Sequence, residues 1–195
     1  MLEQFVNLPA DLVIFYGGYN ENILPLNYDP RPGYPYNYYY KHECPAWRLF
    51  LIRYSAILGE AEKRFGIISG IRSMKDSSPE LQRQWYESIV SMYFQTLADA
   101  EKLSTGVIRN QLGKSARFIA LYQPYQVPDA FSRSHAQIRK RIGELSYGVD
   151  LSACLDSLSA SGAEVYFDRV HVSPGADAVI AGRIADEVVR SVSFP

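Results

Sequence analysis

Two short sequences carry residue types that can take part in acyl transfer. Asp168 stands three residues before His171, a spacing that lets a carboxylate meet an imidazole within a single turn. The carboxylate would accept the Nδ1 proton and fix the tautomer, so that Nε2 can take a proton from a hydroxyl nucleophile and return it to the leaving group. Residues 17–21 read Gly-Gly-Tyr-Asn-Glu, and the Asn20 amide could donate to the oxyanion of a tetrahedral intermediate. Such a donor is typically worth about 3 to 4 kcal/mol in the barrier.

Each motif also has a plainer explanation. An isolated Asp-x-x-His is common in surface turns and helix caps, and Gly with Asn is what a chain reversal with positive φ requires. The setting favours the catalytic interpretation, because both motifs follow predicted strands. A helix start, Ser173 followed by Pro174, comes directly after the histidine.

The strands that would position these motifs are short apolar runs. Residues 11–16 end in Gly-Gly and residues 117–122 end in Gln-Pro, as expected of strands buried on both faces of a parallel sheet. Residues 164–167 are predicted as a further strand. The carboxyl ends of such strands are where α/β sheets bind ligands, and both motifs lie at such ends.

Between the strands, apolar residues recur at helical spacing. Helices are predicted over 45–65, 79–100, 129–145, 150–162 and 174–188. Strands alternating with amphipathic helices give an α/β layer fold with a parallel sheet. We find no linker that divides the chain, so residues 1–195 are predicted to form a single domain.

Composition excludes several classes of partner. With 195 residues, of which 47% are hydrophobic, the chain can bury a core, and its formal net charge of -1 creates no field toward nucleic acid or anionic lipid. No window approaches the roughly 18 apolar residues of a membrane span, and the N-terminus lacks the pattern of a signal peptide. We therefore expect no nucleic acid and no membrane span, whereas the compartment stays open because the true start of the protein can lie upstream.

Residues 24–44 are rich in tyrosine and proline and show no helical or strand period, which predicts an ordered loop or insertion. It could form an aromatic wall beside the site or pack on its own domain. His42, Glu43 and Cys44 are metal-ligand types, but adjacent residues rarely point at one ion, so no metal is expected. The spacing of Cys44 and Cys154 indicates free or buried thiols, and His135 lies on an apolar helix stripe as a packed histidine.

Taken together, the motifs resemble those of the SGNH hydrolases, the GDSL esterase and lipase superfamily. Residues 11–21 are similar to the strand and Gly-x-Asn-Asp block of that family, with Glu21 where Asp is commoner, and residues 166–175 are similar to its last block. The resemblance implies a three-layer α/β/α, flavodoxin-like fold without its N-terminal strands. It implies His171 as base and acid, Asp168 as its orienter and Asn20 as oxyanion donor, with Gly18 and Tyr19 beside the substrate, a small ester. No cofactor follows from this mechanism.

The chain departs from the family in one respect that matters more than the match. The Gly-Asp-Ser block that carries the nucleophile precedes the Gly-x-Asn-Asp block in the family, and it occurs nowhere in this sequence. Ser69 lacks the strand-to-helix setting that would expose a nucleophile. We therefore expect the isolated chain to be inactive, since loss of the nucleophile typically costs on the order of 10⁶ in turnover.

Three hypotheses follow. The chain is the C-terminal part of a serine esterase, lipase or carbohydrate deacetylase, or one half of a split hydrolase completed by an N-terminal segment, or a noncatalytic binding or assembly protein. In the isolated chain the edge formed by residues 12–15 is expected to be unpaired and to favour self-association.

Overall fold

The computed structural model describes residues 9–22, 46–47, 50, 54–65 and 78–192. The chain forms two compact units, one made of Met1–Tyr19 and Phe94–Pro195 and the other of Asn20–Tyr93. The predicted insertion at 24–44 and Ser69 lie outside the described residues.

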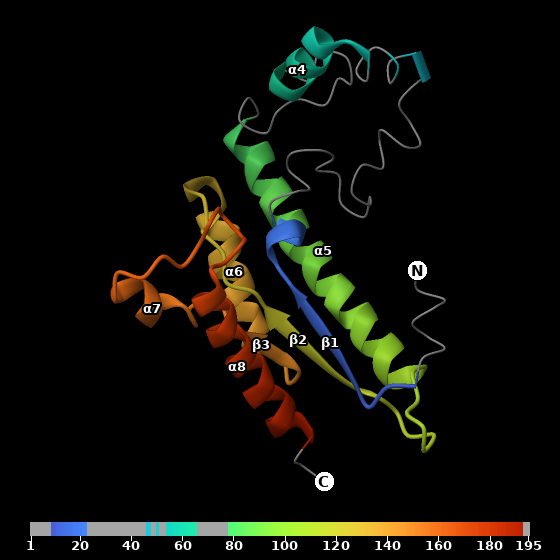
Figure 1. The fold of residues 1–195 in the computed structure, drawn as a ribbon. Coiled ribbons are helices and arrows are strands. Elements are labelled where there is room, and N and C mark those ends of the chain that lie inside the picture. Colours follow the sequence, from blue (N-terminus) through green and yellow to red (C-terminus); the bar gives the residue numbers. More distant parts are fainter. Residues whose placement is uncertain (1–8, 23–45, 48–49, 51–53, 66–77, 193–195) are drawn as a thin grey trace. The chain divides into compact units, whose positions relative to one another are not determined.

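A parallel sheet forms the centre of the first unit (Figure 1). Its strands are β1 (Leu12–Gly17), β2 (Arg117–Tyr122) and β3 (Gly148–Asp150), in the order β1-β2-β3. Ile14 pairs with Ile119 and Tyr16 with Leu121, so these side chains share one face of the sheet. The prediction of parallel strands at 11–16 and 117–122 is confirmed, and with it the general α/β class.

The predicted helices over 79–100, 129–145 and 174–188 are found close to their expected bounds, whereas only residues 156–160 of the predicted helix 150–162 are α-helical. The described helices are α4 (Ala56–Phe65), α5 (Pro79–Gly106), the short 3₁₀ helix η3 (Asp129–Phe131), α6 (Ser132–Ile142), α7 (Asp156–Ala160) and α8 (Pro174–Val192). At the start of α8, the Ser173 Oγ accepts a hydrogen bond from the Ala176 N–H at 3.4 Å, the predicted N-cap.

The segment 45–65 is not one continuous helix. Among its described residues, 46–47, 50 and 54 are helical, Ser55 is not, and α4 begins at Ala56. The Ser55 Oγ accepts a hydrogen bond from the Leu58 N–H at 3.2 Å. A serine that satisfies a free N–H of the next turn starts a new helix, which periodicity alone does not reveal.

One strand was not predicted, and one strand prediction is wrong. Residues 148–150 form β3 although they contain only one large apolar side chain, where the sequence predicts a connection that leads into a helix starting at residue 150. Gly148 permits this, because a Cβ there would lie 2.2 Å from the Ile142 carbonyl oxygen. Residues 164–167 do not join the sheet. Their backbone pairs instead with 171–173 in the same loop, where Tyr166 and Val172 form an isolated antiparallel bridge.

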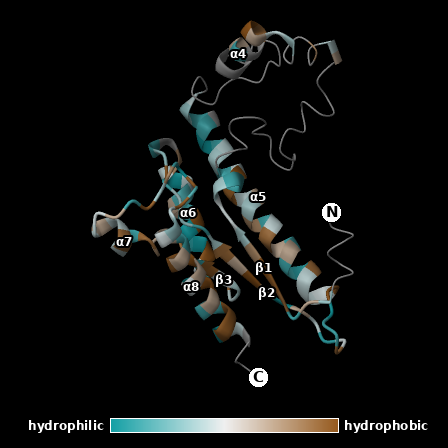
Figure 2. Ribbon diagram, in the orientation of Figure 1, coloured by the Kyte–Doolittle hydropathy of each residue, from teal (hydrophilic) through white to brown (hydrophobic). Residues whose placement is uncertain are grey.

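Helices cover both faces of the sheet. On one face, Ile184 of α8 packs against a buried cluster of Ile119, Leu121 and Leu151. On the other face, His135 of α6 contacts Tyr122 of β2. Figure 2 shows the apolar colouring concentrated on the strands between these helices. The core of the first unit is therefore the sheet itself, with β2 buried from Phe118 to Tyr122.

β1 has the sequence of a central strand but is far less covered than β2. Ile14 and Tyr16 are 42% and 44% exposed, whereas Ile119 and Leu121, their partners on the same face, are 6% and 1% exposed. Among the described strands, β1 is paired with β2 alone. Association through this edge stays a prediction.

No helix in the described part of the chain combines the length and the apolar composition needed to cross a membrane.

Candidate active site

The loop that carries Asp168 and His171 is held closed by its own backbone. The Phe167 N–H donates to the His171 carbonyl at 2.8 Å, and the Ser173 N–H donates to the Val165 carbonyl at 2.8 Å. These bonds use the backbone groups that a sheet strand would have offered to a neighbour. The predicted strand is thus replaced by a tight loop that carries Asp168 and His171, and α8 follows this loop directly in the chain.

Asp168 and His171 meet as their spacing predicts. Asp168 Oδ2 lies 2.6 Å from His171 Nδ1, and Asp168 Oδ1 accepts hydrogen bonds from the backbone N–H groups of His171 and Val170, both at 2.8 Å. The His171 backbone N–H, its ring and the Val170 N–H hold the pKa of the Asp168 carboxyl well below its usual range. Asp168 is therefore ionised and fixed in orientation at neutral pH.

This geometry leaves one ring nitrogen available for chemistry. With Nδ1 bound to the carboxylate, the neutral ring keeps its proton on Nδ1, and Nε2 is free to accept one. The His171 side chain is 74% exposed, so a hydroxyl group from a substrate or another polypeptide segment can reach it. The pair can serve as general base and then as general acid.

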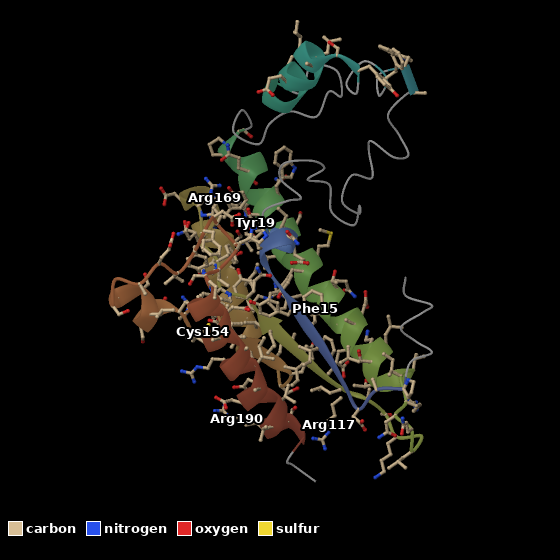
Figure 3. All side chains as sticks on the ribbon, viewed as in Figure 1. Phe15, Tyr19, Arg117, Cys154, Arg169 and Arg190 are labelled. Carbon is tan, nitrogen blue, oxygen red and sulfur yellow. The ribbon has the colours of Figure 1, made fainter. Side chains whose placement is uncertain are left out.

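The loop is attached to the carboxyl end of the sheet. The Gln126 N–H, shortly after β2, donates to the Arg169 carbonyl at 2.8 Å, between Asp168 and His171. The preceding residue, Tyr125, packs edge-on against Tyr19, with ring centroids 5.5 Å apart. Figure 3 shows Tyr19 and Arg169 at the same end of the sheet. The structure thus brings Gly18, Tyr19 and the Asp168–His171 pair to one edge.

Gly18 occupies a position that only glycine tolerates. Its φ is +137°, and a Cβ there would lie 2.4 Å from Cε2 of the buried Tyr122 ring. The turn after β1 therefore needs glycine for both its backbone conformation and its close approach to β2. This requirement explains Gly18 without any role in binding, so a contact between Gly18 and substrate stays a prediction.

Asn20 begins the second unit and lies in the helical turn 19–22. Its side chain is exposed, whereas Asn22, two residues later, is fully buried. An oxyanion donor has to be accessible to a substrate, which favours Asn20 over Asn22 for this role. Its convergence with His171 stays a prediction.

Sequence reasoning missed a polar cluster at the same edge. The Tyr122 hydroxyl lies 2.7 Å from the Tyr125 hydroxyl and 2.8 Å from Nδ1 of His135. His135 is half-buried on α6, as the apolar stripe indicated. However, neither periodicity nor spacing pointed to its tyrosine partners, because these lie in a strand end and an irregular loop.

Cys154 does not have the features of an activated nucleophile. Cys154 is a free, half-buried thiol, and burial raises its pKa, the opposite of what activates a cysteine. Within the described residues, no cluster of three His, Cys, Asp or Glu side chains could hold a metal ion.

A cavity of about 620 Å³ lies elsewhere in the first unit. Its lining includes Arg117 at the start of β2 and Arg190 near the end of α8. Figure 3 shows these two arginines at the end of the sheet opposite Tyr19 and Arg169. Arg190 is already paired with Glu187 at 2.6 Å. We assign this cavity no part in the chemistry of His171.

No protein-family model matches the chain, and no curated protein and no solved structure matches it significantly. Function therefore has to be argued from the residues and their geometry.

Proposed function

We propose that Asp168 and His171 are the acid–base pair of a serine ester hydrolase of the SGNH type, in the class of esterases, lipases or carbohydrate deacetylases. The observation that carries the proposal is the 2.6 Å contact from Asp168 Oδ2 to His171 Nδ1, with Oδ1 fixed by two backbone N–H groups. The two backbone hydrogen bonds fix the carboxylate, the carboxylate orients the imidazole, and the His171 side chain is 74% exposed.

In the proposed reaction, Nε2 of His171 removes the proton of a serine hydroxyl as the serine oxygen attacks the ester carbonyl. The same proton then passes to the departing alcohol, and water, activated in the same way, releases the acid from the acyl-serine. Asp168 stabilises the imidazolium at each step. The Asn20 amide would donate to the oxyanion.

The arrangement of the sheet supports the fold part of the proposal. Flavodoxin-like sheets have the strand order 2-1-3-4-5, and β1, β2 and β3 fit its last three strands. In that order a preceding strand would pair with β1 along the edge that carries the half-exposed Ile14 and Tyr16. The resemblance to the family puts the serine at the end of that preceding strand.

The test is to supply the missing part. The DNA around the gene is translated for an in-frame upstream strand ending in Gly-Asp-Ser, or a neighbouring frame that encodes one, and the two parts are expressed together. We expect hydrolysis of p-nitrophenyl acetate and labelling by a fluorophosphonate only in the completed protein. Both signals should disappear in His171→Ala. Asp186→Asn, an exposed carboxylate on α8, is the matched control and should leave them unchanged.

Two outcomes would overturn the proposal. One is a completed protein whose esterase activity survives His171→Ala. The other is the absence of any segment, upstream or separately encoded, that restores activity.

A second candidate is a noncatalytic assembly protein that keeps the fold. The half-exposed Ile14 and Tyr16 on an apolar strand favour it, because such an edge readily pairs with another polypeptide. Stable pairing through β1 without any His171-dependent hydrolysis would support this second candidate over the first.

A further inference from the structure

Three side chains beyond the Asp168–His171 pair form a compact polar cluster at the carboxyl end of the sheet. Tyr122 and Tyr125 are 0% and 5% exposed, and His135 is half-buried. Nδ1 of His135 lies 2.8 Å from the Tyr122 hydroxyl and 3.3 Å from the Tyr125 hydroxyl, and the two hydroxyls are 2.7 Å apart. Each hydroxyl can donate one hydrogen bond and accept others, whereas Nδ1 of His135 either donates or accepts according to the tautomer. With Nδ1 as acceptor, Tyr122 can donate to His135 and Tyr125 can donate to Tyr122, so both buried hydroxyls have partners.

The cluster fixes Tyr125 more firmly than an ordinary loop residue. Its ring packs edge-on against both Tyr122 and His135, with centroids 6.0 Å and 5.3 Å away. The residue before it, Pro124, is fully buried and restricts the backbone further. A loop that follows a strand is thereby held in one conformation.

Tyr125 and its neighbour Gln126 also contact both predicted parts of the site. The Tyr125 ring lies edge-on to Tyr19, in the turn after β1. The Gln126 N–H donates to the carbonyl of Arg169, which lies between Asp168 and His171. A shift of Tyr125 would therefore move the support of the Asp168–His171 loop and the turn that carries Tyr19 at the same time.

We propose that Tyr125 is a positioning residue for the Asp168–His171 pair, acting through its hydroxyl anchor and the adjacent Gln126 backbone. This inference rests on the proposed function for its catalytic meaning. The positioning itself is measurable without hydrolysis, because the proton on Nδ1 of His171 reports on the contact with Asp168.

The test compares tyrosine variants of the full chain by NMR. Long-range ¹H–¹⁵N correlation of the His171 ring at alkaline pH gives the ratio of the Nδ1–H to the Nε2–H tautomer of the neutral imidazole. We expect Tyr125→Ala to lower that ratio about fivefold, the change in population that loss of one typical hydrogen bond produces. Tyr125→Phe keeps the ring against Tyr19 and should give an intermediate ratio, and circular dichroism checks that both variants fold.

The matched control is Tyr147→Ala. Tyr147 also packs edge-on against an aromatic ring, that of Phe118, at a centroid distance of 5.4 Å, but it precedes β3 and lines the cavity at the other end of the sheet. The control should leave the His171 ratio unchanged. An unchanged ratio in folded Tyr125→Ala, or an equal change in Tyr147→Ala, would overturn the inference.

The two proposals can fail separately. If Tyr125→Ala changes the ratio but no completed protein ever hydrolyses an ester, the positioning holds and the hydrolase proposal falls. If hydrolysis depends on His171 but neither the ratio nor kcat responds to Tyr125→Ala, the hydrolase proposal holds and the positioning falls.

Discussion

Replacing Asp168 by Asn is the sharpest single perturbation of the candidate site. The amide oxygen can still accept the two backbone hydrogen bonds that Oδ1 accepts from Val170 and His171, so the loop should keep its shape. The amide nitrogen would then face Nδ1 of His171 in place of Oδ2. Because that nitrogen only donates, Nδ1 has to become the acceptor, and the ring proton moves to Nε2.

The consequence for catalysis follows from where the proton lies. Nε2 cannot accept a proton from a nucleophile when it already carries one, so general-base catalysis is lost. General acid–base catalysis contributes about 10²- to 10⁴-fold, and the corresponding substitution in serine proteases costs about 10⁴-fold in kcat. The pair is exposed, with Asp168 at 54% and His171 at 74%, so water can replace part of what the carboxylate supplies. We therefore expect a loss in kcat of about 10²- to 10⁴-fold in the completed protein.

Two measurements check this prediction. In the chain itself, the ¹⁵N signals of the His171 ring should change from the Nδ1–H to the Nε2–H tautomer in Asp168→Asn, with far-ultraviolet circular dichroism unchanged. In the completed protein, kcat for p-nitrophenyl acetate should fall while KM changes little. A wild-type tautomer in Asp168→Asn would show that the carboxylate does not orient the ring, and the reasoning would be refuted.

Three further predictions concern stability and association. In urea titrations, Gly18→Ala should lower the free energy of unfolding by about 1 to 3 kcal/mol, because alanine is strained at φ +137° and its Cβ would meet the buried Tyr122 ring. The control Gly182→Ala, which has open space around it in α8, should raise the free energy of unfolding by about 0.5 to 1 kcal/mol. In light-scattering measurements, Ile14→Lys should weaken self-association of the chain about tenfold. The control Leu112→Lys changes a more exposed residue in a loop and should leave self-association unchanged. Equal weakening by the two substitutions would contradict an interface at β1. Burial and the charge of Arg139 lower the pKa of His135, so on acidification the unfolded chain binds a proton at this residue before the folded chain does, and the free energy of unfolding should fall as pH drops below about 6.5. His135→Gln should make the free energy of unfolding less dependent on pH in this range. An unchanged pH dependence in His135→Gln would show that other groups cause it.

Many of the strands and helices are predictable because each depends on the pattern of apolar residues within its own segment. The apolar runs ended by Gly-Gly and Gln-Pro became β1 and β2, and the stripes of apolar residues became α5, α6 and α8. The spacing of Asp168 and His171 predicted their contact, because three residues within one turn bring two side chains together whatever surrounds them. Local sequence therefore determined both the main elements and the most specific contact of the candidate site.

The errors arose where backbone pairing depends on distant partners. Residues 148–150 carry little strand pattern and form β3 because Gly148 lets them lie against the end of α6. Residues 164–167 carry a strand pattern and yet pair with 171–173 instead of the sheet. Strand propensity shows which segments can adopt an extended backbone, whereas the segments that pack beside them determine whether they join the sheet.

The sequence by itself determined which residues can exchange a proton and that the carboxylate and the imidazole meet. Only the tertiary structure decided that Tyr122, Tyr125 and His135 gather at the same end of the sheet and that Ile14 and Tyr16 of β1 are half-exposed. The physical reason is distance along the chain. Contacts within one turn follow from backbone geometry alone, whereas contacts between a strand end, a loop and a helix exist only after the sheet has packed.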